Sequence, residues 1–151
     1  MIGIINYGLG NIQSFLNSYR LLGIDSCSVS NFYDLKKCDH LVLPGVGAFD
    51  EAMTRLNASN LINSIEKLVF EENIPILGIC VGLQIMARRS EEGKNRGLGW
   101  IDADVGLIKK TKNLPLPHMG WNKINIKNNE ARILNGVDDR SLYFLHRYCL
   151  K

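Results

Sequence analysis

The stretch that decides the fold is Ile76-Leu77-Gly78-Ile79-Cys80-Val81-Gly82-Leu83-Gln84. Residues 74–79 form an apolar run typical of a buried strand, and residues 83–88 continue with helical spacing. A cysteine between two glycines at a strand-to-helix junction has the form of a nucleophile elbow, because glycine gives a sharp turn the clearance it needs. Such a turn presents its central side chain at the carboxyl end of the sheet. The pattern therefore predicts that Cys80 is a nucleophile.

The predicted position of Cys80 also suits its chemistry. At a helix N-terminus, unpaired amides and the macrodipole favour thiolate over thiol. Attack of a thiolate on an amide carbonyl creates an oxyanion, and the backbone N–H of Val81 is well placed to donate to it. Most free cysteines are simply small buried residues. The flanking glycines, the strand before Cys80 and the helix after it favour the catalytic interpretation instead.

A second glycine-containing loop, Pro44-Gly45-Val46-Gly47-Ala48-Phe49, follows the short apolar run at residues 41–43. Its glycines allow backbone amides to turn toward a ligand or a developing anion. Taken alone, this is an ordinary strand-end loop. In a doubly wound sheet, however, the loops at the carboxyl ends of neighbouring strands meet in one crevice. We therefore expect Gly47 to supply a second oxyanion donor opposite Val81.

Apolar runs alternate with helical periodicity in the first half of the chain. This β-α-β-α order predicts an α/β fold with a parallel, helix-covered sheet. Beyond Gly93 the pattern indicates further strands with little helix between them. At 151 residues, the chain is expected to form one domain, 1–151. The predicted strands are residues 2–5, 27–30, 41–43, 74–79, 105–108, 121–126 and 142–145, and the first helices are 12–22, capped by Asn11, and 61–69.

Composition argues against several classes of protein. The net charge of +3 is small and the basic residues are scattered, which argues against a nucleic-acid partner. No Cys-x-x-Cys pair is present, and Cys38-x-His40 is weak evidence, so no metal site is predicted. Without a signal pattern or a membrane-length apolar run, a cytoplasmic protein with free thiols and no membrane partner is expected. Gly8-x-Gly10 lacks the third glycine of a dinucleotide fingerprint, since position 13 is Gln, and no cofactor is expected.

The segment Pro117-His118-Met119-Gly120-Trp121-Asn122 combines imidazole, indole and carboxamide groups in an expected loop that enters a strand. An aromatic side chain with a polar handle suits an interface. A structural histidine is an equal alternative for His118. His146 alternates with Phe144 and Tyr148 on one strand face, which favours a packed or interface residue over a catalytic base.

These segments together resemble the class I, or triad, glutamine amidotransferases, and among them the glutaminase subunits (HisH) of imidazole glycerol phosphate synthase. The elbow and the loop at residues 44–49 are shared widely among triad amidotransferases, whereas the His-Met-Gly-Trp-Asn segment is particular to this subunit. The resemblance implies a flavodoxin-like, doubly wound, mostly parallel sheet of the class I type. The matching segments lie in family order at residues 6–11, 44–49, 78–84, 88–93, 117–122 and 143–148.

The resemblance also implies a reaction. Cys80 attacks glutamine to give a glutamyl thioester and ammonia, and water then releases glutamate. Gln84 and Gly47 match family positions that hold the substrate glutamine, and the oxyanion and substrate site is expected to include Gly45, Val46 and Val81 as well. Ammonia passes to a (β/α)8-barrel cyclase subunit (HisF) in a heterodimer, which uses it to form imidazole glycerol phosphate in histidine biosynthesis.

The resemblance further assigns an interface. Asn11, His118, Trp121 and His146 correspond to the region that faces the barrel partner. Paralogues of this pair supply ammonia for the amidation of surface-polysaccharide sugars, and residues 97–103 share features with that branch. The acceptor of the ammonia therefore stays open between these two branches.

One departure from the family pattern concerns the base. The family's catalytic histidine and glutamate lie in a Gln-Phe-His-Pro-Glu type motif, which the 151 residues do not contain. We therefore expect a domain that is truncated at its C-terminus and has little or no glutaminase activity alone, because loss of a general base typically costs about 10²–10⁴-fold in rate. Two alternatives from other classes stay open: a DJ-1-like cysteine protein and a non-catalytic module that docks on a barrel partner.

Overall fold

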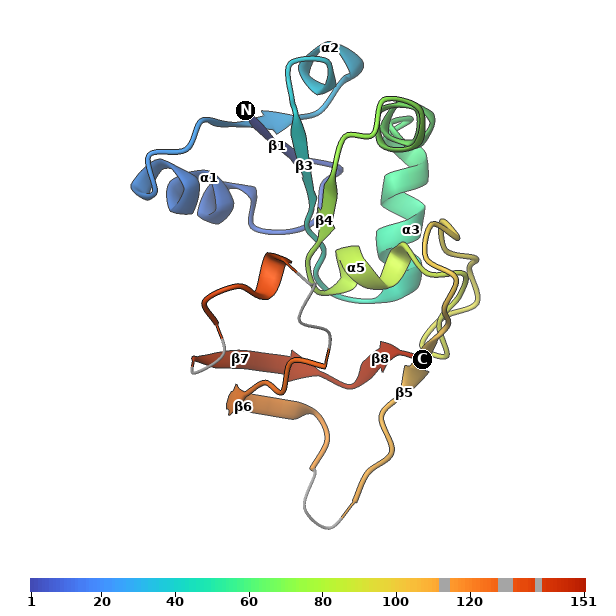
Figure 1. Cartoon of the computed structure of the whole chain (residues 1–151). Coiled ribbons are helices and arrows are strands. Elements are labelled where there is room, and N and C mark those ends of the chain that lie inside the picture. The colour runs from blue at the N-terminus through green and yellow to red at the C-terminus, as the bar shows by residue number, and fades with distance from the viewer. Residues whose placement is uncertain (112–114, 128–131, 138–139) are drawn as a thin grey trace. The chain divides into compact units, whose positions relative to one another are not determined.

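The computed structural model describes residues 1–111, 115–127, 132–137 and 140–151. The chain divides into two compact units (Figure 1). The first unit comprises Met1–Gly106 and Leu150–Lys151, and the second comprises Leu107–Cys149. Each unit is described by itself below.

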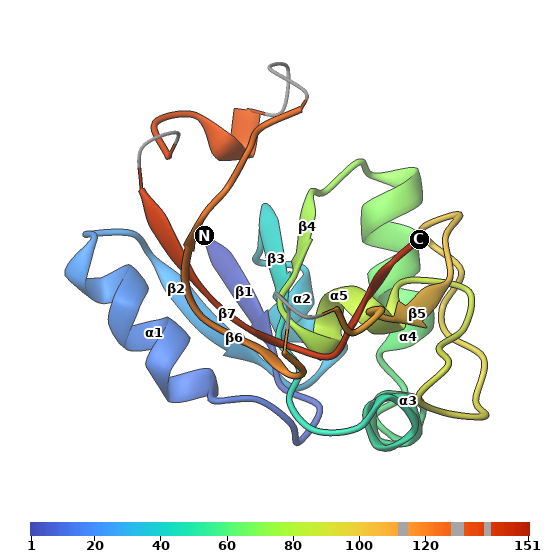
Figure 2. The same cartoon turned by 90° about the horizontal axis from the view of Figure 1, so that it is seen from below.

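Four strands of the first unit form one parallel sheet in the order β2-β1-β3-β4, as Figure 2 shows. In this register Leu43 of β3 lies opposite Gly78 of β4, so the loops after both strands begin at the same edge of the sheet. The α/β class and the parallel sheet predicted from the sequence are confirmed. The strands are β1 (Ile2–Ile5), β2 (Ser26–Val29), β3 (His40–Leu43) and β4 (Ile76–Gly78).

The helices of the first unit cover both faces of this sheet, with α1 and α3 on opposite sides (Figures 1 and 2). The predicted cap is present, since the Asn11 side chain accepts a hydrogen bond from the Ser14 amide at 3.0 Å. The predicted helix at residues 61–69 forms as a short α-helix that continues as a π-helix. The elements are α1 (Ile12–Leu21), α2 (Phe32–Leu35), α3 (Phe49–Ala58), α4 (Ile62–Glu66), the π-helix Lys67–Glu71 and α5 (Val81–Ile85).

The core of the first unit lies between the sheet and α3, α4 and α5. Helix α3 was not predicted, although Phe49, Ala52, Met53 and Leu56 have the spacing of one buried helix face. All four side chains are buried against apolar residues of β1, β3 and α5. Because Phe49 directly follows the glycine loop, this packing anchors the end of that loop to the core.

The second unit contains a two-stranded antiparallel ribbon of β6 (His118–Lys123) and β7 (Ser141–His146). The interpretation of residues 118–120 as a loop is wrong, since β6 begins three residues before the predicted strand at 121, and this strand ends at Lys123 rather than at 126. A 3₁₀ turn at Arg132–Leu134 lies between these strands in the sequence. Strands β5 (Val105–Leu107) and β8 (Tyr148–Leu150) form a separate two-stranded pair. Among the described residues, no helix has the length and apolar character that crossing a bilayer requires.

Candidate functional site

Cys80 lies at the turn between β4 and α5 and is the N-cap residue of that helix. Its backbone adopts φ 55° and ψ −120°, a combination that costs a non-glycine residue about 1–3 kcal/mol and that clusters at functional sites. The side chain is exposed and forms no disulfide. The sharp turn of a nucleophile elbow is therefore present, and it directs the thiol to solvent.

Two glycines bring the elbow and the loop after β3 into direct backbone contact. A β-carbon added at Gly82 would overlap the carbonyl oxygen of Leu43, and one added at Gly45 would meet the Gly82 amide. Only glycine allows this approach at either position. The Cys80 turn and the Gly45–Gly47 loop are thus packed backbone to backbone at the carboxyl edge of the sheet.

This contact gathers the residues predicted to bind an oxyanion. The Val81 N–H has no backbone acceptor among the described residues, as expected for the first residue of a helix. Gly47 has φ +83° and open space around it, and Val46 beside it is 51% exposed. Gln84 lies one helical turn after Cys80 and is half-buried. Cys80, Val81, Gly47 and Gln84 therefore belong to one region of the first unit.

Tyr7 holds the start of the loop after β3 through a hydrogen bond, a role that was not predicted from the sequence. Its hydroxyl donates to the Pro44 carbonyl at 2.7 Å, and the side chain is only 6% exposed. Burial raises the pKa of Tyr7 to about 12, so the hydroxyl remains a donor. A tyrosine two residues after a buried apolar run was the available signal, because a buried hydroxyl needs a partner.

A pair of carboxylates fastens the start of α3 to a distant loop, and we call this pair the carboxylate latch (Asp50 and Glu92). Helix α3 has no side-chain cap of its own at Ala48. Instead, Glu92 accepts a hydrogen bond from the Phe49 amide at 2.9 Å. Asp50 in turn accepts the backbone amides of residues 94 and 95 at 2.9–3.0 Å.

The latch fixes the chain immediately after the glycine loop. Gly93 completes it, because a β-carbon at this position would overlap the Asp50 carboxylate. The hydrogen bonds from Lys94 and Asn95 lower the pKa of Asp50 below its ordinary value. Because Phe49 stands only two residues after Gly47, a displaced helix start would displace the candidate oxyanion donor as well.

The histidines of the chain are not placed as a base beside Cys80 within the first unit. Its single histidine, His40, begins β3 and contacts Asp39 at 2.8 Å. The amino end of β3 is the opposite edge of the parallel sheet from the elbow. The other two histidines belong to the second unit.

In the second unit, His118 and His146 face each other across the ribbon and form one hydrogen-bonded chain. His146 Nδ1 lies 3.1 Å from the Tyr148 carbonyl, which can only accept, so this nitrogen carries the proton. With neutral rings, His146 Nε2 then accepts from His118 Nδ1 at 2.9 Å, and His118 Nε2 accepts from the Asn122 amide at 3.1 Å. Every ring nitrogen is occupied, which matches the packed or interface role expected from the sequence better than a free base.

The comparisons with known proteins agree with this geometry. Residues 4–151 match the glutamine amidotransferase class-I family. The chain belongs to the class-I glutamine amidotransferases. It is 40% identical over 149 residues to imidazole glycerol phosphate synthase subunit HisH 2 of Pseudomonas aeruginosa, covering 98% of this chain and 73% of the relative. It is 41% identical to subunit HisH of Bdellovibrio bacteriovorus, covering 98% of this chain and 74% of that protein.

A solved structure supports the fold of this amidotransferase. A crystal structure of a glutamine amidotransferase superposes with a TM-score of 0.71 at 16% identity, covering 99% of this chain and 73% of that one. This chain spans about three quarters of the length of the two curated relatives named above. The expected class I sheet is confirmed. Among the described residues of this amidotransferase, no three metal-binding side chains gather at one point.

One face of the ribbon of this amidotransferase is apolar and exposed. The register places Met119 opposite Leu145 and Trp121 opposite Tyr143, all on one side of the two strands. Trp121 is 71% exposed, and its ring lies edge-on to Tyr143 with centroids 5.5 Å apart. Exposed large apolar side chains that share a face are typical of a binding surface. Asn11, by contrast, belongs to the first unit and uses its side chain to cap α1.

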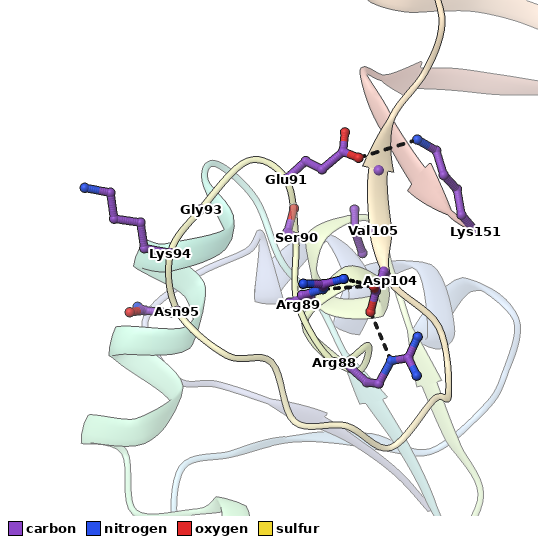
Figure 3. Close-up of a pocket in the computed structure, with 11 residues that line it drawn as sticks. Arg88, Arg89, Ser90, Glu91, Gly93, Lys94, Asn95, Asp104, Val105 and Lys151 are labelled. Carbon is purple, nitrogen blue, oxygen red and sulfur yellow. Dashed lines mark hydrogen bonds and ion pairs between the residues drawn. The ribbon is translucent and has the colours of Figure 1, made fainter.

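A hollow of about 550 Å³ in the first unit is lined by charged residues after α5 (Figure 3). Arg88 and Arg89 both donate to Asp104, at 3.0 and 2.8 Å, as the dashed lines in Figure 3 show. These arginines hold the pKa of Asp104 below its usual value. Neither Cys80 nor the glycine loop lines this hollow. Its arginines are engaged in holding the chain between α5 and β5.

Proposed function

We propose that this chain is a glutaminase subunit of the imidazole glycerol phosphate synthase type, in which Cys80 hydrolyses glutamine to glutamate and ammonia. The observation that carries the proposal is the backbone contact between the Cys80 elbow and the Gly45–Gly47 loop. That contact sets an exposed thiol at a helix N-terminus beside backbone donors. The 40% identity to a HisH subunit supports the same substrate.

In the proposed reaction, the Cys80 thiolate attacks the side-chain carbonyl carbon of glutamine. The developing oxyanion accepts hydrogen bonds from the Val81 and Gly47 amides, which do not need to reorganise as the charge appears. Collapse of the tetrahedral intermediate breaks the C–N bond, and the leaving nitrogen takes a proton to depart as ammonia. Water then hydrolyses the thioester and releases glutamate. Gln84, one turn from the thiol, and the Gly45–Gly47 loop would hold the substrate.

The proposed reaction needs a general base, and the described arrangement supplies none within the first unit. His40 lies at the opposite edge of the sheet, and the 151 residues contain no His-Pro-Glu motif. Base catalysis contributes about 10²–10⁴-fold to a rate. The proposed reaction therefore draws its base from outside the first unit.

The proposed partner is a (β/α)8-barrel cyclase subunit of the HisF type, bound as a heterodimer in the cytoplasm. The ribbon supports this assignment, because the exposed Trp121 and Tyr143 combine apolar area with polar atoms, as interface anchors do. The His118–His146 pair holds the opposite face of the same ribbon rigid. Asn11 would meet the partner from the first unit.

Labelling with the glutamine analogue diazo-oxo-norleucine tests the proposal. We expect covalent modification at Cys80, competition by glutamine, and no modification of Cys80→Ala. Fast oxidation of Cys80 by peroxide without analogue labelling would support a DJ-1-like cysteine protein instead. Adding a barrel partner and measuring glutamate separates an enzyme from a docking module, since stable binding without analogue labelling or glutamate release would leave only the module.

A further inference from the structure

Two further thiols lie together in the first unit, on the side of the sheet away from β4. Cys27 is on the outer strand β2, and Cys38 lies in the turn between α2 and β3. Their sulfur atoms are 3.7 Å apart, and both are free thiols. A disulfide needs a separation of about 2.05 Å. Small rotations of the two side chains would therefore bring the sulfur atoms to bonding distance.

Strand β1, which pairs with β2, leaves space for the two thiols at a glycine. Gly3 of β1 lies opposite Cys27 in the sheet register. A β-carbon at Gly3 would come within 2.6 Å of the Cys38 sulfur, so this sulfur occupies the space that a side chain would take. Glycine inside a strand weakens it and often marks a close approach by another group. The thiol pair supplies that close approach here.

The two thiols differ in access. Cys27 is half-buried and lines a hollow of about 480 Å³ together with Asn17, Arg20 and Ser26. Cys38 is only 6% exposed and donates a weak hydrogen bond to the Asp34 carbonyl at 3.3 Å. Burial, with a smaller contribution from Cys27, raises the pKa of Cys38 to about 12. A reagent from solvent therefore meets Cys27 first. Cys38 reacts only with a group that has already reached or modified Cys27.

We propose that Cys27 and Cys38 form a redox-sensitive dithiol site that low-molecular-weight disulfides convert to an internal disulfide. The Cys27 thiolate attacks a disulfide RSSR and forms a mixed disulfide with release of one RS⁻. Cys38 then loses its proton to the released thiolate and attacks the Cys27 sulfur, and the second RS⁻ that is expelled takes up the proton that Cys27 lost in forming its thiolate. Two protein thiols are oxidised and one RSSR is reduced to two thiols, so electrons and protons balance. Arg20 and Asp25 both line the hollow, one charge of each sign, and oxidised glutathione serves as the probe disulfide.

The crosslink would join β2 to the turn that starts β3, the strand whose far end continues into the Gly45–Gly47 loop. It closes a short loop of the chain and so restricts the unfolded state. The oxidised protein should therefore unfold at a higher urea concentration than the reduced protein. This effect is separate from the proposed glutaminase chemistry, because Cys80 takes no part in it.

The test uses the full chain with Cys80→Ala and Cys149→Ser, so that only the pair can react. The folded protein is treated with oxidised glutathione, blocked with N-ethylmaleimide and digested with trypsin without reduction. We expect peptides 21–36 and 38–55 to appear joined, with both thiols lost together and a glutathione adduct on Cys27 only as a transient. A lasting adduct on Cys27 with Cys38 still free, or two thiols that both take up the blocking reagent, would overturn the proposal.

Single variants sharpen the assignment of roles. Cys38→Ser should accumulate the Cys27 adduct, whereas Cys27→Ser should leave Cys38 unmodified in the folded chain. Modification of Cys38 in folded Cys27→Ser at the rate seen for Cys27 would contradict the order of attack. Because Cys38→Ser places a hydroxyl in the core, the time course of the double variant described above decides the matter if Cys38→Ser fails to fold.

Discussion

The two units of the chain build their candidate sites from different parts of the polypeptide. In the first unit the candidate site is built from backbone: glycine-to-glycine contact, a strained turn at Cys80 and amides left free at a helix start. In the second unit the ribbon presents side chains, with Trp121 and Tyr143 exposed on a two-stranded support. Backbone packing tolerates almost no substitution, because a single added methyl group has nowhere to go. A side-chain surface tolerates substitution in the fold but not in binding.

Gly82→Ala is expected to have the largest effect and tests the backbone half of this comparison. The new β-carbon would overlap the Leu43 carbonyl, a backbone atom of a buried strand. We expect a loss of about 3 kcal/mol or more in the free energy of unfolding, at the upper end of overpacking costs. Urea denaturation followed by circular dichroism measures it. Gly47→Ala is the control, because it has open space and bears only about 1–2 kcal/mol of left-handed backbone strain. Equal losses of unfolding free energy in the two variants would show that backbone conformation, rather than the close contact with Leu43, requires glycine at position 82.

Trp121→Ala tests the side-chain half. Its 71% exposed ring contributes little to stability, whereas a buried tryptophan anchor at an interface is worth about 2 kcal/mol or more. We expect a barrel partner to bind roughly 30-fold more weakly by calorimetry, with the unfolding midpoint unchanged. Tyr33→Ala, an aromatic residue 77% exposed in the first unit, is the matched control. Unchanged affinity for Trp121→Ala would remove the ribbon face from the interface.

Tyr7→Phe tests whether a side chain also contributes to the backbone site. The variant keeps the ring in the core but leaves the Pro44 carbonyl without its donor. We expect a loss of about 1 kcal/mol in unfolding free energy. We also expect the substitution to slow the labelling of Cys80 by the glutamine analogue more than it slows labelling by iodoacetamide. A uniform slowing with both reagents would mean that Tyr7 acts on the whole unit and not on the loop.

Asp50→Asn is expected to have the smallest effect and is read best through pH. The pKa of Asp50 is lowered in the folded chain, so its contribution to stability is present above the ordinary value of 3.8 and is lost as pH falls through the lower folded value. The unsubstituted chain should therefore lose more stability than Asp50→Asn on acidification across that range. Glu51→Asn is the matched charge control, because it removes the ion pair with Arg55 and leaves the latch in place. Coincident profiles for the Asp50 variant and the unsubstituted chain would discount the latch.

The sequence predicts the elbow well because its signal is local. A strand, two glycines and a helix within nine residues specify the turn at Cys80. The parallel sheet was likewise predictable from alternating periodicities. The latch was not, since Asp50 and Glu92 act on residues more than forty positions away and no period links them. The start of β6 was missed because Pro117 and Gly120 favour a loop, whereas pairing with β7 holds His118–Lys123 extended.

Residue roles divide in the same way. Asn11 could be assigned as a cap because capping depends on the next three residues. The support that Tyr7 gives to Pro44 depends on two strands meeting, which a single sequence does not show. The roles proposed for Cys80, Gln84 and the ribbon residues remain predictions that the labelling and binding experiments test.

The carboxylate latch also has a consequence for the order of folding. Helix α3 cannot receive its cap until the segment at residues 92–95 arrives, long after β3 and the glycine loop have left the ribosome. We expect the β1–β3 pairing to form in the transition state and the latch to close afterwards, with φ-values near zero at Asp50 and Glu92. The start of α3, and with it the end of the Gly45–Gly47 loop, would then be fixed after the surrounding core has formed.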